Sequence, residues 1–442
     1  MTRRSADLPY KTREVAMLTS RRMLSLLLAA AAAAVILSGC YAAPVSEATE
    51  QGGETSGAIV TDSKIPVTTY PVPEENIRVF GNMAASASTG GFWQWDTFFR
   101  PYIQAYDPVT RTTYVPCYQS GCRHNDPTCN ACFGDLQYLV EYRGNYYAMV
   151  YTNNETASVL ITRPLSGGPL QILASWEPEN ENEECRCVLR YVSFGKAYVS
   201  VNKETYALSE DGQQTDAVLK TSLVSVDLQT GAISSILEND YDYDLYGVWG
   251  DIAAFRVLEM AEDAPEFEDW LAQQPEGTAW DEYDRQFVRY RFLTRNLQTG
   301  EENMLVDTLE DFVMTVDPHR SWGQYAVYQA GRSLFAYDLE KQTAKKLFTY
   351  EQDWDFYNYM ILDGHVITIC GTEDICRSWA IGIADGVVTE LDTRGGDVVV
   401  FSADYECDGY FKGLLTEPSG NVEECYISKE DFYRSNYDGA FH

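Results

Sequence analysis

Most of the chain alternates short apolar runs with glycine-containing turns. One such run reads YLVEYRGNYYAMVY (138–151), and others read YVSFGKAYVSV (191–201) and YMILDGHVITIC (359–370). Each places β-branched and aromatic residues on both sides of a central turn, which predicts a pair of antiparallel strands. The glycines at the turns of seven such units are Gly91, Gly144, Gly195, Gly250, Gly323, Gly364 and Gly409. The pattern predicts an all-β protein.

A second hairpin follows each of these units. Clear examples read TRPLSGGPLQIL (162–173) and VDLQTGAISSIL (226–237), and ISKEDFYRS (427–435) is the weakest. Successive turn glycines lie 41 to 73 residues apart, and a four-stranded unit of about 40–50 residues is the repeat of a β-propeller blade. We predict a single β-propeller of four-stranded blades over residues 76–442, with seven blades and with six or eight as alternatives. The sequence does not decide whether residues 77–86 or the C-terminal strand closes the ring.

The repeat assigns each connection to one of two faces of the ring. With the strands of a blade lettered a to d from the inside outward, the a–b and c–d turns share one face, called the turn face below. The b–c loops and the d-to-a connections share the other, called the loop face. The long segments belong to the loop face, including an acidic insertion at 259–285, in which APEFEDWLAQ predicts a short helix with Pro265 in its first turn.

The loop face is rich in acidic and aromatic residues, and long loops on a rigid scaffold often carry binding residues. Such a surface favours cationic peptides, Ca²⁺ or sugars that stack on aromatic rings, although acidic loops also keep a protein soluble. The alternating aspartates at 240–244 are similar to a calcium loop, but Leu245 stands where that loop needs glycine. The residues that we expect at a ligand surface are Asp240, Asp242, Asp244, Trp270, Trp280 and Trp354.

The N-terminus has the pattern of a secretory signal. Arg21 and Arg22 precede an unbroken apolar run (23–37) that ends in Leu-Ser-Gly-Cys40. The run is too short for a stable spanning helix, and its basic start and small residues before the cut predict a cleaved signal over 1–39, with Met17 as an alternative start. The last four residues resemble the bacterial lipobox, which implies a diacylated Cys40. An uncleaved anchor is the alternative, and residues 40–75 are expected to form a flexible tether.

The charge of the chain limits its partners. It has 33 basic and 66 acidic residues with a pI near 4.4, and removal of residues 1–39 would leave 27 basic and 64 acidic residues. This balance disfavours nucleic acid, whose phosphates need a basic face, and electrostatic docking on anionic lipid. We expect a monomer held by its lipid on the extracytoplasmic side of the cell membrane.

Apart from Cys40 there are ten cysteines, an even number that favours disulfides in an exported protein. Four lie in CYQSGCRHNDPTCNAC (117–132), which joins blades 1 and 2 on the loop face. Cys185 and Cys187 lie in the next connection and are expected nearby. Cys370 and Cys376 bracket GTEDI and fit a bridge within one hairpin, whereas no partner can be assigned to Cys407 or Cys425.

The same segment also fits a metal site. Cys117, Cys122, His124 and Cys129 would supply three thiolates and one imidazole to a closed tetrahedral Zn²⁺ site, with Cys132 as a fifth candidate. Their spacing differs from the two-residue knuckle common in zinc fingers. We expect disulfides first, a structural metal second and a reactive thiol third; no cofactor is required, and zinc or calcium would be the ion.

The lipobox, the acidic tether, the repeated hairpins and CYQSGCRHNDPTCNACF (117–133) together resemble the lipid-anchored β-propeller proteins of Gram-positive gut bacteria of the clostridial kind. Many of those proteins carry a C-x4-C-[KR]-H-x4-C-N-A run early in the first blades. At the position of Cys132 the family usually has an aromatic residue, so this cysteine is extra. The blades are similar in style to those of TolB and of low-density-lipoprotein-receptor propellers. The resemblance implies a fold and a location but no activity.

The sequence therefore predicts a surface lipoprotein that binds a protein, peptide or glycan without catalysis, through the face that carries the cysteine run. A carboxylate-dependent glycan hydrolase or lyase on the same face is one alternative. A metal-handling surface protein is the other. Motifs of serine hydrolases, zinc peptidases and phosphate-binding loops are absent from the sequence.

Overall fold

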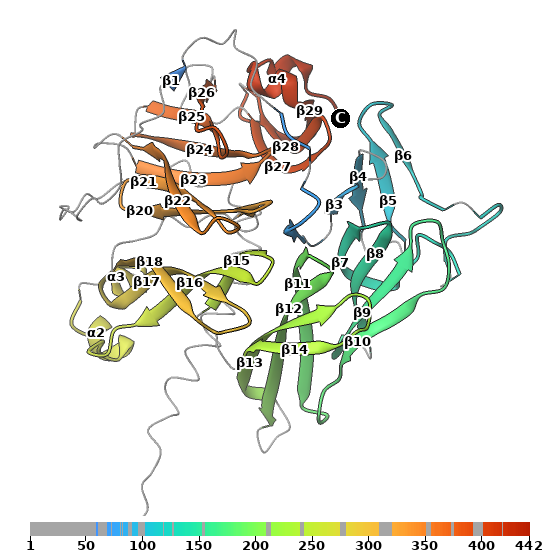
Figure 1. Ribbon diagram of the computed structural model, residues 1–442, viewed down its shortest axis with the longest axis horizontal. Helices are drawn as coiled ribbons and strands as arrows, with labels where there is room; N and C mark the ends of the chain where they lie inside the picture. The colour runs from blue at the N-terminus through green and yellow to red at the C-terminus, as the bar shows by residue number, and fades with distance from the viewer. Residues whose placement is uncertain are drawn as a thin grey trace, which may run out of the picture.

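The structure is a computed structural model, and it describes residues 59–60, 69–71, 73–79, 81, 83–86, 91–95, 102–117, 119–125, 128–152, 155–208, 214–238, 243–274, 280–308, 321–350, 355–372, 375–391, 401–417 and 419–442. Seven antiparallel sheets are arranged around a centre (Figure 1). The chain is a seven-bladed β-propeller, as the repeat predicts. The signal segment and Cys40 lie outside the described residues. Within the described part, no helix has the length and apolar character needed to cross a membrane.

The first four blades are built from consecutive strands. Blade 1 contains β3 (Met83–Ser86), β4 (Gly91–Gln94), β5 (Gln104–Asp107) and β6 (Thr112–Tyr114). Blade 2 contains β7 (Asp135–Tyr142), β8 (Asn145–Thr152), β9 (Ala157–Pro164) and β10 (Gln171–Trp176). Blade 3 contains β11 (Glu183–Ser193), β12 (Lys196–Leu208), β13 (Gln214–Asp227) and β14 (Ile233–Leu237). Blade 4 contains β15 (Tyr243–Trp249), β16 (Ile252–Met260), β17 (Val288–Asn296) and β18 (Glu302–Thr308).

The last three blades complete the ring. Blade 5 contains β19 (Ser321–Trp322), β20 (Tyr325–Ala330), β21 (Ser333–Asp338) and β22 (Thr343–Thr349). Blade 6 contains β23 (Asp355–Leu362), β24 (His365–Thr372), β25 (Ile375–Gly382) and β26 (Val388–Leu391). Blade 7 contains β27 (Phe401–Cys407), β28 (Tyr410–Thr416) and β29 (Val422–Ser428). Two short strands precede blade 1: β1 (Ile59–Val60) pairs in parallel with β26, and β2 (Ile77–Arg78) pairs with β11.

The first strand of each blade faces the centre of the ring. Contacts run in sequence from β3 through β7, β11, β15, β19 and β23 to β27, and β27 contacts β3 again. Blades 1 and 7 are therefore neighbours that complete the ring. Each of these two blades is built from its own end of the chain, so neither of the two closing strands that we considered is exchanged between them.

The turns follow from local side-chain chemistry. Six of the seven predicted glycines lie in a–b turns with positive φ, but Gly91 instead begins strand β4. The c–d turns use an Asp or Asn that caps its own turn. The Asp227 carboxylate accepts hydrogen bonds from the backbone N–H groups of Gln229 and Thr230 (3.0 and 2.8 Å), and Asn296 accepts an equivalent pair in blade 4. Such Asx turns are a favoured local conformation of these residues.

The segment ISKEDFYRS is not the hairpin that we predicted. Ser428 caps α4 (Lys429–Tyr433), where its hydroxyl accepts a hydrogen bond from the N–H of Asp431 (3.0 Å). The 3-10 helix η1 (Tyr437–Gly439) follows, and Phe441 then pairs with Tyr426 as a single antiparallel bridge beside β29. The capping pair of Ser and Asp explains why the chain turns into a helix here.

The insertion in blade 4 contains the predicted helix, α2 (Phe267–Leu271). It also contains a second helix, α3 (Trp280–Phe287), which we did not predict from the sequence. Pro265 lies just before the N-cap Glu266 rather than in the first turn. The insertion encloses a small apolar cluster of its own around Phe267, Trp270 and Tyr283.

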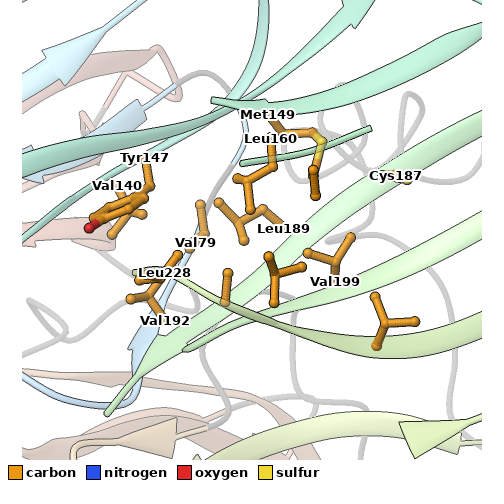
Figure 2. Close-up of a cluster of buried hydrophobic side chains, with 14 of the residues drawn as sticks. Val79, Val140, Tyr147, Met149, Leu160, Cys187, Leu189, Val192, Val199 and Leu228 are labelled. Atoms are coloured by element: carbon orange, nitrogen blue, oxygen red, sulfur yellow. The ribbon is translucent and has the colours of Figure 1, made fainter. Parts of the chain in front are cut away.

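The hydrophobic core lies between neighbouring blades. Figure 2 shows one such cluster, in which Tyr147 and Leu160 of blade 2 face Leu189 and Val199 of blade 3, and Val79 from the N-terminal segment joins them. Each fully buried aliphatic side chain of this size contributes roughly 1.5–3 kcal/mol through the hydrophobic effect. Val79 shows that the N-terminal segment belongs to the core.

A pH-dependent effect is expected from Asp404, a half-buried residue on β27. Burial raises the pKa of its carboxyl group to about 6, although Lys412 opposes the shift. Because this folded pKa exceeds the unfolded value, the folded state is stabilised by protonation as the pH falls through 6 toward 4. We expect Asp404→Asn to stabilise the protein by about 1–3 kcal/mol at pH 8 and to have little effect at pH 4. Thermal unfolding at both pH values checks this, and an equal effect at both would contradict it.

Candidate metal centre

The connection between β6 and β7 gathers four metal-ligating side chains. The ligand atoms of Cys117, Cys122, His124 and Cys129 all lie within 4.8 Å of one another. These are the four residues of the predicted site. Cys132, the fifth candidate, is not in the group; it is buried in the core between blades 1 and 2.

The backbone places His124 over the cysteines. His124 has a φ of +55°, and its Nδ1 lies 3.3 Å from Sγ of Cys129. A tetrahedral zinc ion with ligands at about 2.0–2.3 Å separates them by roughly 3.5 Å. The separation of His124 Nδ1 and Cys129 Sγ is therefore close to that of two ligands of one zinc ion, and all four ligand atoms lie within 4.8 Å of one another.

Each of the three cysteine sulfurs accepts a backbone hydrogen bond from the residue two positions later. The donors are Gln119 to Cys117, His124 to Cys122 (3.4 Å) and Ala131 to Cys129. Hydrogen bonds to the charged form favour it, so this arrangement suits three thiolates. Outer hydrogen bonds of this kind also orient metal ligands.

Hydrogen bonds hold the connection against blade 1. The N–H of Ile103 donates to the carbonyl of Ala131 (2.9 Å), and Tyr102 pairs with Cys132 in an antiparallel bridge. Within the connection, the side-chain amide of Gln119 donates to the carbonyl of Thr128 (2.6 Å). These contacts fix the two ends of the loop that carries the ligands.

Arg163 of β9 lies beneath the site. Its side chain is fully buried, and Nη1 donates to the carbonyl oxygens of Cys129 and Cys132. Its guanidinium also lies 5.4 Å from the centre of the Phe133 ring. A zinc ion with three thiolates and a neutral imidazole carries one net negative charge, so a buried cation next to the loop offsets the charge of the loaded site.

Burial opposes ionisation of the innermost thiol. Burial raises the pKa of Cys129 to about 12. At Cys117 burial acts in the same direction, but hydrogen bonds from Gln119 and from the neighbouring thiols lower the pKa below its ordinary value. Without a metal the Cys129 thiol therefore keeps its proton at neutral pH, and a bound metal ion would have to displace it.

The donor set fits zinc rather than calcium. Calcium takes oxygen ligands, whereas three sulfurs and one imidazole are typical of structural zinc. One disulfide among the three cysteines would leave a thiol over, whereas a single zinc ion uses every member of the group. All four positions would be filled by the protein, so the site could hold a loop but would have no open position for a substrate.

The other predicted cysteines lie elsewhere. Cys185 and Cys187 are fully buried thiols of β11 and pack in the core between blades 2 and 3. We expected them near the metal cluster, and they are not part of it. Cys370 and Cys376 lie on the paired strands β24 and β25 one register position apart, and their side chains lie outside the described atoms. The predicted bridge between Cys370 and Cys376 stays a prediction, whereas Cys185 and Cys187 are free cysteines in the structure.

Two of the expected ligand-surface residues serve the fold instead. Asp244 lies in β15 and forms an ion pair with Arg256 (3.0 Å), so the predicted calcium loop is not supported there. Trp270 is 6% exposed, because it packs into the insertion's own cluster. Asp240, Asp242 and Trp354, and the side chain of Trp280, lie outside the described residues.

A buried ionic network was not predicted. The ammonium group of Lys429 in α4 donates to Asp363 Oδ1 (2.9 Å) and Glu406 Oε2 (3.0 Å), and the Tyr433 hydroxyl donates to Asp363 Oδ2 (2.9 Å). The three ionic groups come from blade 6, blade 7 and α4, so no local spacing connects them. They lie near the turn face, and a lysine neutralises the carboxylate pair, unlike the open pair that glycan hydrolysis requires.

Comparison with known proteins finds only distant similarity to solved structures. No family model matches the chain, and no curated protein matches it. Among solved structures, the chain is similar to the β-propeller domain of the Trilobed protease from Pyrococcus furiosus, with 11% identity, a TM-score of 0.42 and coverage of 83% of this chain and 94% of that one. An oligogalacturonate lyase in complex with manganese shares 11% identity, with a TM-score of 0.36 and coverage of 82% and 84%. TolB from Acinetobacter baumannii also shares 11% identity, with a TM-score of 0.31 and coverage of 80% and 77%.

Proposed function

We propose that this β-propeller is a non-enzymatic binding module whose loop face is ordered by a structural zinc ion. The observation that carries the proposal is the closed group of Cys117, Cys122, His124 and Cys129 on the long connection between blades 1 and 2. A fully protein-filled zinc site supports structure rather than turnover. Fixing a long loop lowers the entropy cost of binding a partner through it.

The proposal includes a location. Acylation of Cys40 would anchor the chain to the outer side of the cell membrane, where two acyl chains give stable attachment. The partner would be a surface protein, peptide or glycan. The acidic loop between β10 and β11, with exposed residues such as Glu177 and Glu181, supports cationic groups on that partner.

The test compares the two faces of the same molecule. The chain from residue 41 onward is immobilised and offered surface proteins and wall glycans. Changing Glu177 and Glu181 to Gln on the loop face is expected to weaken retention of the bound partner at least fivefold. Glu301 and Glu340 are exposed on the turn face, and changing both to Gln should leave retention of the partner unaltered. Equal losses on both faces, no retained partner, or release of new sugar ends from the glycans would each overturn the proposal.

A further inference from the structure

We propose that the described residues of 70–81 (70–71, 73–79 and 81), called the strap below, close the propeller ring by crossing its centre, in place of a strand shared between the first and last blades. In Figure 1 the blue N-terminal segment runs through the middle of the ring before it enters β3. This role is independent of the zinc site and of the lipid anchor.

The strap begins at the turn face against blades 6 and 7. The N–H of Tyr70 donates to Asp363 Oδ1 (2.7 Å), and Lys429 Nζ donates to the carbonyl of Tyr70 (3.5 Å). The Tyr70 ring lies 5.5 Å from that of Trp322 in blade 5. Gly364 makes this approach feasible, because a Cβ at that position would lie 2.8 Å from the Tyr70 ring.

Asn76 then joins blades 3, 4 and 5 at one point. Its N–H donates to Ser193 Oγ (3.2 Å), its Oδ1 accepts from the N–H of Val248 (3.0 Å), and its Nδ2 donates to the carbonyl of Gly323. The side chain is buried, and its φ of +55° is one that asparagine tolerates better than most residues. Removing this amide would leave buried polar groups of separate blades without their partner.

Glu75 joins blades 2 and 3 next to it. Its carboxylate accepts hydrogen bonds from the Tyr142 hydroxyl (2.9 Å) and from the backbone N–H of Phe194, and it pairs with Arg143 (2.5 Å). These partners lie in or beside the a–b turns of the two blades. The strap thus contacts the turn-face end of the ring across several blades rather than along one edge.

The strap then rises through the centre and enters blade 1. β2 pairs with β11, Val79 packs between blades 2 and 3 (Figure 2), and Gly81 pairs with Tyr138 of β7. Directly afterwards the chain forms β3. One end of the strap is therefore bound to blades 6 and 7, and the other end is continuous with blade 1.

This path spans the seam that no strand crosses. Blades 1 and 7 meet through side chains, with the Tyr106 and Tyr426 rings stacked at 4.2 Å and the Gln94 amide donating to the Tyr426 hydroxyl (2.9 Å). Backbone hydrogen bonds across this seam are absent between β27 and the strands of blade 1 that the structure describes. The strap supplies the covalent and hydrogen-bonded link from inside the ring.

Hydrogen exchange at the seam tests the inference in the chain from residue 41 onward. Asn76→Ala is expected to speed amide exchange at least tenfold in Gly91–Gln94 and Phe401–Cys407, which Asn76 does not touch. The control Asn296→Ala removes an asparagine with two hydrogen bonds from an outer turn of blade 4, and it should leave the seam unchanged. Faster exchange confined to the surroundings of Asn76 in blades 3–5 would overturn the closing role.

A milder variant keeps the inference testable if Asn76→Ala does not fold. Glu75→Gln keeps the size of the side chain and weakens its ion pair with Arg143. It should speed exchange at the same seam strands by a smaller factor, about threefold. Unchanged exchange there in the folded Glu75→Gln variant, together with faster exchange near blades 2 and 3, would count against the strap as the closing element.

Discussion

Replacing Cys129 by serine is expected to remove the metal from the purified protein, whereas replacing Cys132 by alanine should leave it in place. The wild-type chain should carry about one zinc ion, because its four ligand atoms already lie within 4.8 Å. A structural zinc site of this kind contributes about 10–16 kcal/mol of binding free energy. Loss of one ligand in four should therefore weaken binding roughly 100-fold or more.

Cys132 is a demanding control. It lies three residues from Cys129, is also buried, and has a carbonyl that accepts from the same guanidinium of Arg163. Elemental analysis and thiol titration, before and after chelation, give the result. No metal, together with fewer titratable thiols in the unfolded wild type than it has cysteines, would show that cysteines of the chain are disulfide-bonded and would contradict the zinc site. Metal loss in both variants would show that general disturbance of the loop is responsible.

Metal affinity should rise with pH. The thiol of Cys129, with its pKa raised to about 12 by burial, is protonated when no metal is bound, and the ion must displace that proton. Raising the pH makes this displacement easier, so binding tightens between pH 6 and 8.

The blades and the ligand set were predictable because both are encoded locally. Strand, glycine turn and capped outer turn recur within short windows, and Cys117 to Cys129 lie in a single loop. The helix α4 was also readable in principle, because Ser428 with Asp431 three residues later is an N-cap pattern.

Other features depend on contacts between distant residues. We expected the tether to continue to residue 75, because its Pro, Glu and Thr content is typical of a linker, yet Tyr70 and Glu75 already bind the ring. Their partners are 293 and 119 residues away, and no local pattern reports such pairs. The prediction that Trp270 lies at a ligand surface was wrong for a related reason. An insertion long enough to form its own apolar cluster buries the aromatic residues that would otherwise line a surface.

Removing the buried ammonium group of Lys429 is expected to lower the free energy of unfolding by several kcal/mol. Lys429→Met keeps the aliphatic stem and removes the ammonium group that contacts Asp363 and Glu406. Both carboxylates would then lie buried without that cation, which costs about 3–5 kcal/mol. For a domain of this size we expect a fall of roughly 4–6 °C in Tm at pH 8. The pair of Lys341 and Asp338 has the same 2.9 Å separation, and its aspartate is buried, but its lysine side chain is 66% exposed. Because water already solvates that ammonium group, Lys341→Met should cost less than about 1 kcal/mol.

The pH dependence of the Lys429→Met defect identifies its cause. Burial alone would lower the pKa of Lys429, but Glu406 and Asp363 raise it above its ordinary value, so the wild-type interaction persists throughout the neutral range. Burial already raises the pKa of Glu406, and loss of the cation would raise it further. Protonation of Glu406 should then relieve the variant as the pH falls, and the difference in Tm from wild type should shrink. Adding Glu406→Gln to Lys429→Met should recover part of the loss at pH 8. A defect that is independent of pH and unrelieved by the second substitution would mean that packing around the lysine stem, and not its charge, stabilises this blade.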